Sequence, residues 1–559
     1  MFNLPFLKSK NKRGVKPLVL VIMDGFGLAP PSNGNAITLA KTPNFDRYMH
    51  TFPHGDLIAS GEAVGLPANE VGNTEVGHLT IGAGRVIFQD LKRINVSIEK
   101  GGFYDNKAFL KAAAHAKEYS SKIHLMGLVG SGNVHSSIEH LNALLQFCKK
   151  EDLNRVYLHI FTDGRDSPPQ DGIEVVKKLV EHMRSIKVGQ IATVSGRYYA
   201  MDRDRRWPRT EKAYNAIVLG RGVYANSAEE AISNSYKTGK TDEFIEPSVM
   251  VYNGAPIATV DDNDAVIFFN FRVDRPKQLA MAFVLGNFEN LTTFDFGYDP
   301  ETSRNVGEVE VGATFKRGKV AKNIFFVTMT EYQKGLAVSA VAFGPEVVND
   351  SLPSVLSENK LKQLHMAESE KERFITYYLN GLREQPLEGE DDMIIPSPKI
   401  ATYDLKPEMS LPQLVGTLTK EINRNIYGFV AVNFANPDMV AHTGNIAATI
   451  NAIEFVDRYL GNLVDAILKL NGRLIITADH GNAEELLTFP ASTFFYTTSH
   501  GNVNTDHSSN PVPVIFIGNG LINKKTAPIK GALSDIGPTI LTMLGIPVPS
   551  VMTGKNLLL

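Results

Sequence analysis

The sequence of 559 residues has one cysteine, Cys148, and no long apolar run. A single cysteine cannot form an intramolecular disulfide, which indicates a reducing compartment, and we expect a cytoplasmic location. No apolar run approaches the roughly 18 residues that a membrane-spanning helix needs, so the sequence excludes a membrane protein. The first residues, MFNLPFLKSKNKR, place the apolar stretch before the basic cluster, the reverse of a secretory signal.

The sequence also lacks an excess of charge of either sign. Lys and Arg number 57 and Asp and Glu number 60, which gives a formal net charge of −3. This balance argues against a protein whose main task is to bind a nucleic-acid backbone, so we expect neither nucleic acid nor a membrane as a partner. At about 150 residues per domain, the length predicts two to four domains, each with its own core.

Apolar segments that end at polar turns recur along the chain. They are 17–25, 123–130, 155–164, 190–197, 264–272, 427–438 and 472–481. Continuous apolar runs without alternation are typical of strands covered on both faces, as in parallel sheets. Helical spacing of apolar residues in 138–148 and 450–467 predicts helices between such strands. We therefore predict an α/β fold with two mostly parallel sheets flanked by helices, and a hairpin or insertion in the more polar segment 291–325.

One group of polar residues directly follows the predicted strands. It comprises Asp24, Asp438, His442, Asp479 and His480, and His507 near the C-terminus can join it. In an open parallel sheet, functional residues gather where strands end at their carboxyl edge. Mixed carboxylate and imidazole ligands suit Mn²⁺ or Zn²⁺, and a pair of such sites suits a two-metal phosphoryl-transfer centre. Taken singly, each residue also fits an ordinary turn or a helix-surface position.

The segment Gly72–His78 places a hydroxyl, Thr74, between glycines at a predicted helix start. Such a hydroxyl can act as a metal-activated nucleophile. The alternative is that Thr74 only caps the helix, with Glu75 in its first turn.

A second set of strand ends carries arginines instead of carboxylates. The set is His135, Arg165, Asp166, Arg197, Arg203, Arg272 and Arg275. Converging arginines bind phosphate and carboxylate groups through paired hydrogen bonds, and Asp166 among them is a candidate acid/base for a substrate hydroxyl. For the neighbouring Arg205, Arg206 and Arg209 we expect instead solvated side chains that form surface ion pairs.

Several long motifs resemble one family. They include VIMDGFG, GNTEVGHLTIGAGR, TDGRDSPP, SGRYYAMDRDRRW, FFNFRVDR, AESEK, NFANPDMVAHTGN and TADHGNAE, in family order over nearly the whole chain. The chain resembles the 2,3-bisphosphoglycerate-independent (cofactor-independent) phosphoglycerate mutases of the alkaline phosphatase superfamily. The resemblance implies a phosphatase-like domain in two parts, 1–88 and 345–559, interrupted by a phosphotransferase domain, 89–344.

Carried over position by position, the resemblance implies two metal positions. One is formed by Asp438, His442 and His507, and the other by Asp24, Asp479, His480 and the Thr74 hydroxyl. We expect two Mn²⁺ ions, with Zn²⁺, Co²⁺ or Mg²⁺ as alternatives, and no organic cofactor. The substrate-binding positions implied are His135, Arg165, Asp166, Arg197, Arg203, Arg272, Arg275 and Lys371.

The implied activity is interconversion of 3-phosphoglycerate and 2-phosphoglycerate by a monomer, through a phosphoenzyme at Thr74. Asp166 would move a substrate proton, and Lys371 would offset charge on the transferred group. Thr74 stands where the family normally has serine, and its extra methyl crowds the attacking oxygen. The segments 291–325 and 488–504 look longer than the usual connections. Two other readings remain open: a related metal-dependent phosphomutase or phosphomonoesterase, and a catalytically inactive relative that only binds ligand.

Overall fold

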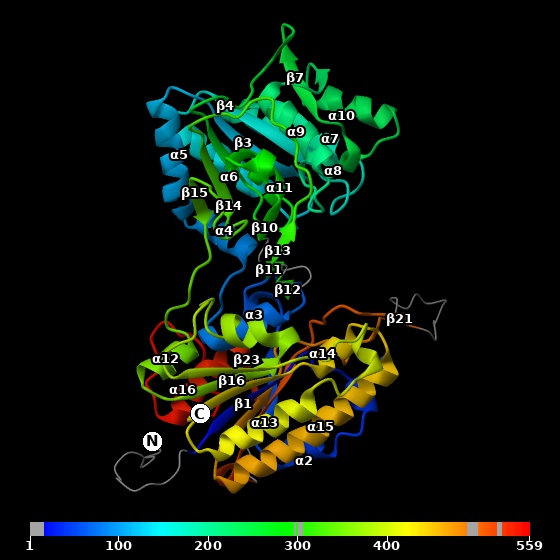
Figure 1. The fold of residues 1–559 in the computed structure, drawn as a ribbon, viewed down its shortest axis with the longest axis vertical. Coiled ribbons are helices and arrows are strands. Elements are labelled where there is room, and N and C mark those ends of the chain that lie inside the picture. Colours follow the sequence, from blue (N-terminus) through cyan, green and yellow to red (C-terminus); the bar gives the residue numbers. More distant parts are fainter. Residues whose placement is uncertain are drawn as a thin grey trace. The chain divides into compact units, whose positions relative to one another are not determined.

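The computed structural model describes residues 16–295, 298–299, 304–305, 307–488, 501–522 and 528–558. The chain divides into two compact units (Figure 1). Unit 1 comprises Met1–Gln89 and Glu346–Leu559, and unit 2 is Asp90–Pro345. Each contains a mostly parallel sheet flanked by helices, so the predicted fold class is confirmed. Among the described residues, no helix is both long and apolar enough to cross a membrane.

The sheet of unit 1 has eight strands. In sheet order they are β17 (Glu390–Ile395), β16 (Gln363–Glu368), β18 (Phe429–Phe434), β1 (Leu18–Met23), β19 (Arg473–Thr477), β22 (Val512–Gly518), β2 (His54–Ile58) and β23 (Ile529–Ala532). The first five run parallel to one another, and β22 pairs antiparallel with both neighbours. Every residue of β1 and β18 is buried, as expected for strands covered on both faces.

Helices cover both faces of this sheet. One layer contains α2 (Pro43–Thr51), α13 (Leu411–Asn423) and α15 (Ile446–Lys469); the other contains α3 (Thr74–Ala83), α12 (Leu352–Glu358) and α16 (Ile536–Leu544) (Figure 1). Helix α15 begins at the cap residue Asn445, whose side chain accepts a hydrogen bond from the Ala448 amide. Its buried face includes Ile453, Val456 and Leu460, as the spacing predicts.

The main sheet path of unit 2 runs β15 (Ala340–Phe343), β14 (Phe325–Thr330), β9 (Ala265–Phe268), β3 (Ile123–Val129), β4 (Val156–Thr162), β5 (Gln190–Gly196), β7 (Ser248–Tyr252) and β6 (Val223–Ala225). The strands from β15 to β5 are parallel, and β7 is antiparallel to β5. A ninth strand, β8 (Ala255–Pro256), pairs with β7.

Unit 2 has two apolar clusters. One gathers side chains of α5 (Lys107–Glu118), α6 (Ile138–Lys150), α7 (Gly172–Ile186) and α10 (Ala228–Lys237); the other gathers those of α9 (Trp207–Leu219) and α11 (Lys277–Val284). These cores hold the central strands in place, so the strand ends present their polar residues from a rigid support.

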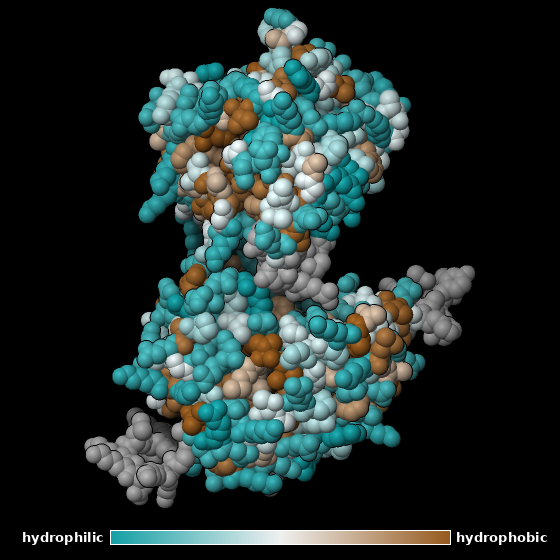
Figure 2. All heavy atoms as spheres, in the orientation of Figure 1, coloured by the Kyte–Doolittle hydropathy of each residue, from teal (hydrophilic) through white to brown (hydrophobic). Residues whose placement is uncertain are grey.

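The segment 291–325 contains the antiparallel pair β10 (Thr293–Asp295) and β13 (Glu308–Glu310), and within it the pair β11 (Tyr298–Asp299) and β12 (Arg304–Asn305). Most of the segment 488–504 lies outside the described residues. On the face shown in Figure 2 the surface is mainly hydrophilic with scattered apolar residues, as is normal for folded chains.

Candidate metal centre and anion pocket

Four neighbouring parallel strands of unit 1 bring polar side chains to one edge of the sheet. Asp24 follows β1, Asp479 and His480 follow β19, and Lys371 is the third residue after β16. Asp438 lies on α14 (Asn436–Ala441), the short helix directly after β18. Because β16, β18, β1 and β19 are adjacent and parallel, their carboxyl ends meet, and residues far apart in the sequence become neighbours.

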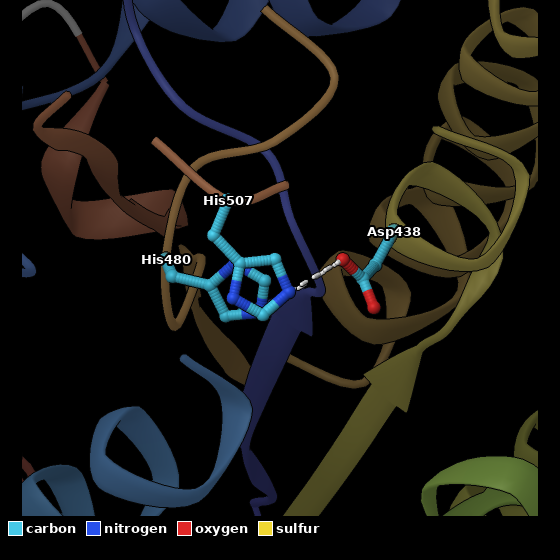
Figure 3. A group of neighbouring side chains, drawn as sticks. All are labelled: Asp438, His480 and His507. Carbon is cyan, nitrogen blue, oxygen red and sulfur yellow. Dashed lines mark ion pairs between the residues drawn. The ribbon is translucent and has the colours of Figure 1, made fainter. Parts of the chain in front are cut away.

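The first candidate metal group is built around Asp438. The ligand atoms of Asp438, His480 and His507 all lie within 4.8 Å of one another (Figure 3). His507 Nε2 is 3.6 Å from Asp438 Oδ1, the pair marked by the dashed line. His442, one helical turn after Asp438, places Nε2 3.2 Å from the same oxygen and 3.2 Å from His507 Nε2. Asp438, His442 and His507 therefore converge as the sequence predicts.

The second group is fully buried. Asp24, Asp479 and His480 offer ligand atoms within 4.8 Å of one another, and all three residues are 0% exposed. His480 Nε2 lies 3.3 Å from Asp24 Oδ1 and 3.6 Å from Asp479 Oδ2. His480 is thus common to both groups, so the two candidate positions are neighbours.

Thr74 is the first residue of α3 and faces these groups. Its Oγ1 is 2.9 Å from His480 Nε2 and donates to Asp24 Oδ1 at 3.4 Å. The helix is capped by Asn73, whose side chain accepts from the Val76 amide, so the alternative in which Thr74 serves only as the helix cap is wrong. The hydroxyl stands where the helix N-terminus favours negative charge.

Gly77, one turn into α3, permits this placement. A Cβ at Gly77 would lie 2.5 Å from the carbonyl oxygen of Asp479 and 2.7 Å from its Cβ. Only glycine lets α3 approach the Asp479–His480 segment this closely, and the close approach places Thr74 against His480.

Lys371 lies in the same cluster. Its Nζ donates to Asp438 Oδ2 at 2.6 Å, Asp24 Oδ1 at 2.9 Å and Thr74 Oγ1 at 3.2 Å. Burial alone would lower the pKa of Lys371, but the surrounding carboxylates, led by Asp24, outweigh burial and raise it. The lysine therefore stays charged beside the Thr74 hydroxyl.

The electrostatics of unit 1 favour cations. Burial works against a charge on His480, but Asp479, Asp24 and Asp438 outweigh it and raise the pKa of His480 to about 10. Burial would raise the pKa of Asp479, yet His480, His78 and Lys371 lower it to about 2. Asp479 thus remains ionised, and His480 holds a proton where a metal ion could bind.

The donor set fits divalent cations. Asp479 Oδ2 is buried and has no hydrogen-bond partner among the described residues. The Nε2 atoms of His442 and His507 face each other at 3.2 Å. Both nitrogens are satisfied only when a proton or a cation lies between them. Carboxylate oxygens with imidazole nitrogens suit Mn²⁺, Co²⁺ or Zn²⁺.

The sequence analysis did not predict three residues that hydrogen-bond to the cluster or to the backbone beside it. Asn433 Nδ2 donates to Asp24 Oδ2 at 2.7 Å, and Asn482 Nδ2 donates to Asp438 Oδ1 at 2.8 Å. Glu484 accepts from the amides of Gly27 and Asn482, both at 2.9 Å. The signal for Asn433 was available, because it is a lone amide inside an otherwise apolar strand.

Unit 2 repeats the arrangement with arginines. Strands β9, β3, β4 and β5 are adjacent and parallel. The segments after them carry the predicted residues His135 (after β3), Arg165 and Asp166 (after β4), Arg197 and Arg203 (after β5), and Arg272 and Arg275 (after β9). Arg165, Arg197, Arg203 and Arg275 line one cavity of about 280 Å³.

Arg197 is the buried centre of this cluster, with 2% of its side chain exposed. Its Nη1 donates to Asp163 Oδ1 at 2.6 Å and to Asp166 Oδ2, and its Nη2 lies 3.0 Å from His135 Nε2. Burial, only partly offset by Asp274, lowers the pKa of His135 to about 4, so this imidazole is neutral near neutral pH. Arg197 lines the cavity and holds Asp166 through an ion pair, but Asp166, His135 and Arg272 are not among the residues that line it.

Asp274 orients the remaining basic side chains. It lies 2.9 Å from Arg203 Nη1 and 3.3 Å from Arg272 Nε. Arg275 carries no carboxylate partner within ion-pair distance among the described residues, and its Nη1 donates to the Met201 carbonyl at 3.4 Å. Burial and the charges of Arg197 and Arg203 lower the pKa of Arg275 to about 10. The cavity therefore favours anions.

Arg206 and Arg209 also line this cavity, which differs from the expectation of purely surface ion pairs. Both contact Asp202, with Arg209 Nη1 3.2 Å from Oδ2. Arg209 also stacks over the Tyr198 ring, 3.6 Å from its centre. Their sequence signal, a run of alternating charges, does not distinguish a cavity wall from a solvated surface.

A hydroxyl among carboxylates and imidazoles at the edge of a parallel sheet is the arrangement expected of metal-dependent enzymes that act on phosphate esters. Two family models match the chain. The model described as BPG-independent PGAM N-terminus matches residues 94–334, and the model described as type I phosphodiesterase / nucleotide pyrophosphatase matches residues 304–523.

Similar proteins cover the whole chain. The 2,3-bisphosphoglycerate-independent phosphoglycerate mutases of Clostridium beijerinckii and Clostridium acetobutylicum are 47% and 46% identical, each over 97% of this chain and 99% of the relative. A solved structure of Leishmania mexicana phosphoglycerate mutase, at low cobalt concentration, has a TM-score of 0.61 and 28% identity and covers 99% of both chains. This chain belongs to the family of 2,3-bisphosphoglycerate-independent phosphoglycerate mutases and is an isomerase. The family predicted from the motifs is confirmed.

Proposed function

We propose that this enzyme interconverts 3-phosphoglycerate and 2-phosphoglycerate through a phosphothreonine at Thr74. The observation that carries the proposal is the position of Thr74 Oγ1, 2.9 Å from His480 Nε2 and 3.2 Å from Lys371 Nζ at the start of α3. A hydroxyl so placed meets positive charge from a lysine, an imidazole and a helix N-terminus, all of which favour its attack on phosphorus.

Two divalent cations complete the proposed centre. One would be held by Asp438, His442 and His507, and the other by Asp24, Asp479, His480 and the Thr74 oxygen. Bound there, they would lower the pKa of the Thr74 hydroxyl and offset negative charge on the phosphoryl group. The donor types favour Mn²⁺, with Co²⁺, Zn²⁺ or Mg²⁺ as alternatives.

In the first step, Thr74 Oγ1 attacks the substrate phosphorus as an alkoxide. The Oγ1–P bond forms while the bond from phosphorus to the glycerate oxygen breaks, and that oxygen takes up a proton in place of the one that Thr74 lost on becoming an alkoxide. The buried ammonium of Lys371 stabilises the extra charge on the phosphoryl oxygens. The products of this step are phosphothreonine and free glycerate.

In the second step, the other glycerate hydroxyl recovers the phosphoryl group. The arginines of the unit 2 cavity bind the glycerate carboxylate, and Asp166, fixed by Arg197, takes the proton of the attacking hydroxyl. The new O–P bond forms as the Oγ1–P bond breaks, Asp166 releases its proton and the Thr74 oxygen takes one up, which regenerates the hydroxyl. Water must be excluded meanwhile, because hydrolysis of phosphothreonine would make the enzyme a phosphatase.

A coupled mutase assay tests this proposal. Purified protein with Mn²⁺ and 3-phosphoglycerate, without added bisphosphoglycerate, should form 2-phosphoglycerate, and a chelator should stop the reaction. Steady release of inorganic phosphate without 2-phosphoglycerate would identify a phosphomonoesterase instead. Tight binding of 3-phosphoglycerate without any conversion would identify an inactive relative.

We also propose that the enzyme is a cytoplasmic monomer. The single thiol, on the buried Cys148, is consistent with a reducing compartment. Light scattering coupled to gel filtration should give a mass near the chain mass of 61.4 kDa. A mass of twice that value would exclude the monomer.

A further inference from the structure

A third group of potential ligands lies at an edge of the unit 1 sheet, on strands other than β1, β18 and β19. It consists of His365 on β16 and Glu390 and Asp392 on the edge strand β17. The register pairs His365 with Asp392, and Glu390 precedes Asp392 by two residues, so all three side chains share one face of the sheet. Their ligand atoms lie within 4.8 Å of one another.

His365 is aimed into this group without satisfying its own polar atoms. The residue is 0% exposed, and neither ring nitrogen has a hydrogen-bond partner among the described residues. Its Nδ1 is within ion-pair distance of Glu390 Oε1 at 3.2 Å and of Asp392 Oδ1 at 3.9 Å, but it makes a hydrogen bond with neither. Buried imidazoles are normally hydrogen-bonded, so this one points to a missing ligand.

The two carboxylates differ in a way that suits metal binding. Glu390 is buried and fixed, because the Leu387 amide donates to Oε2 at 2.9 Å and the Asn380 amide group donates to Oε1. Such outer hydrogen bonds orient carboxylate ligands in metal sites. The side chain of Asp392 is 23% exposed, so an ion can enter from solvent and keep water ligands.

The charge of the group is unbalanced. Within the described part of the chain, Glu390 and Asp392 both form ion pairs with His365, whereas Asp391 between them pairs with Lys362 at 2.9 Å. Glu390 and Asp392 bring two carboxylates to one imidazole, and a divalent cation bound among them would offset the carboxylate charge. We propose that His365, Glu390 and Asp392 bind a third divalent ion of the first transition row, which ties edge strand β17 to β16.

Metal counting on the full chain tests the proposal. Zn²⁺ serves as the probe, because nitrogen and oxygen sites bind it more tightly than Mn²⁺. Equilibrium dialysis at saturating Zn²⁺ should give one ion fewer per chain for Asp392→Asn than for the unaltered protein. Asp391→Asn is the matched control: this neighbour faces the other side of β17, where it accepts from Tyr427 Oη, and its variant should keep the full count.

A second readout separates this site from the Thr74 cluster. Asp392→Asn should keep mutase activity within about twofold, and Zn²⁺ should raise its melting temperature less than that of the unaltered chain. An unchanged metal count in Asp392→Asn and in His365→Gln would overturn the proposal and leave His365 as a partner of Glu390 alone. Loss of mutase activity together with the ion would also overturn it, because the missing ion would then belong to the Thr74 cluster.

Discussion

Both units place polar residues at the carboxyl ends of parallel strands, but the residues of the two units favour ions of opposite charge. Each gathers its polar residues after four adjacent parallel strands, β16–β18–β1–β19 in unit 1 and β9–β3–β4–β5 in unit 2. Unit 1 places carboxylates and imidazoles there, and unit 2 places arginines. The comparison shows that the sheet supplies a place, and the residues after each strand decide whether that place binds cations or anions.

The two clusters also differ in exposure. In unit 1, Asp24, Asp479 and His480 are completely buried, whereas in unit 2 the side chain of Arg165 is 56% exposed and that of Arg203 is 29% exposed. A resident cation requires a fixed cage of donors, whereas an exchanging anion requires an open entrance. Exposure also varies within each cluster, because Arg197 of unit 2 is 2% exposed and His442 of unit 1 is 38% exposed; the completely buried part of the unit 1 cluster is the group of Asp24, Asp479 and His480.

The largest effect is expected at the nucleophile. Thr74→Ala should lower kcat by about 10⁴-fold or more and abolish phosphoenzyme labelling, because the hydroxyl that accepts the phosphoryl group is gone. Thr74→Ser is the matched control and should keep the label, since it retains the oxygen and removes only a methyl group. Rapid-quench labelling with ³²P-phosphoglycerate measures both, and an unchanged label in the alanine variant would place the nucleophile elsewhere.

A smaller loss is expected when a cation ligand is changed and the arginines are kept. Asp438→Asn should lower kcat by about 10²- to 10³-fold and reduce the Mn²⁺ content, because it removes a carboxylate charge beside Lys371 and His442. Isothermal titration should still detect phosphoglycerate binding through the unit 2 cavity. Full Mn²⁺ content in this variant would remove Asp438 from the metal centre.

The converse change tests the anion cavity. Arg275→Met should raise KM for phosphoglycerate by about 10- to 100-fold, because it removes a charge-assisted hydrogen bond to the anion and such a bond contributes about that factor in affinity. The metal content should stay unaltered. Arg206→Met is the control, because Arg206 lines the same cavity but is already paired with Asp202 and Asp204. Steady-state kinetics should show a smaller KM change in the control, and equal changes would contradict the special role of Arg275.

The smallest effect concerns a histidine of unit 2 outside the cavity. Carboxylates raise the pKa of His480 to about 10, whereas burial lowers that of His140 to about 4. The unfolded chain, with a histidine pKa near 6.5, binds the His140 proton more readily, so stability is lost as pH falls from about 6.5 towards 4. Between pH 7 and 5 this loss is about 2 kcal/mol for unit 2.

His140→Gln removes that titration. Its thermal stability should depend less on pH over this range than that of the unaltered chain, as calorimetry at several pH values would show. Parallel pH dependence in both proteins would mean that His140 does not carry the effect.

Much of the site was predictable because strand ends are visible in the sequence. The apolar run before Asp24 and the one before Asp479 mark β1 and β19, and parallel sheets collect such ends at one edge. Helical spacing likewise predicted that Asp438 and His442 share a face, and their side chains meet at 3.2 Å. Local pattern decides these contacts, so local reasoning finds them.

Other features depend on neighbours from distant segments. The sequence could not assign Arg206 and Arg209 to a cavity wall, because exposure of an arginine is set by what packs across from it. Nothing local distinguishes His365, Glu390 and Asp392 either, since a strand pairing across more than twenty residues creates that group. The sharing of His480 by two metal groups follows from strand order.

By itself, the sequence determined the α/β class, the strand ends that carry chemistry and the identity of the donors, because apolar periodicity and residue type are properties of short segments. Tertiary structure alone decided which donors share an oxygen, which are buried and which charges remain unbalanced. Those properties are set by the order of strands in the sheet and by distances between side chains that lie hundreds of residues apart in the chain, as Lys371 and Asp24 do.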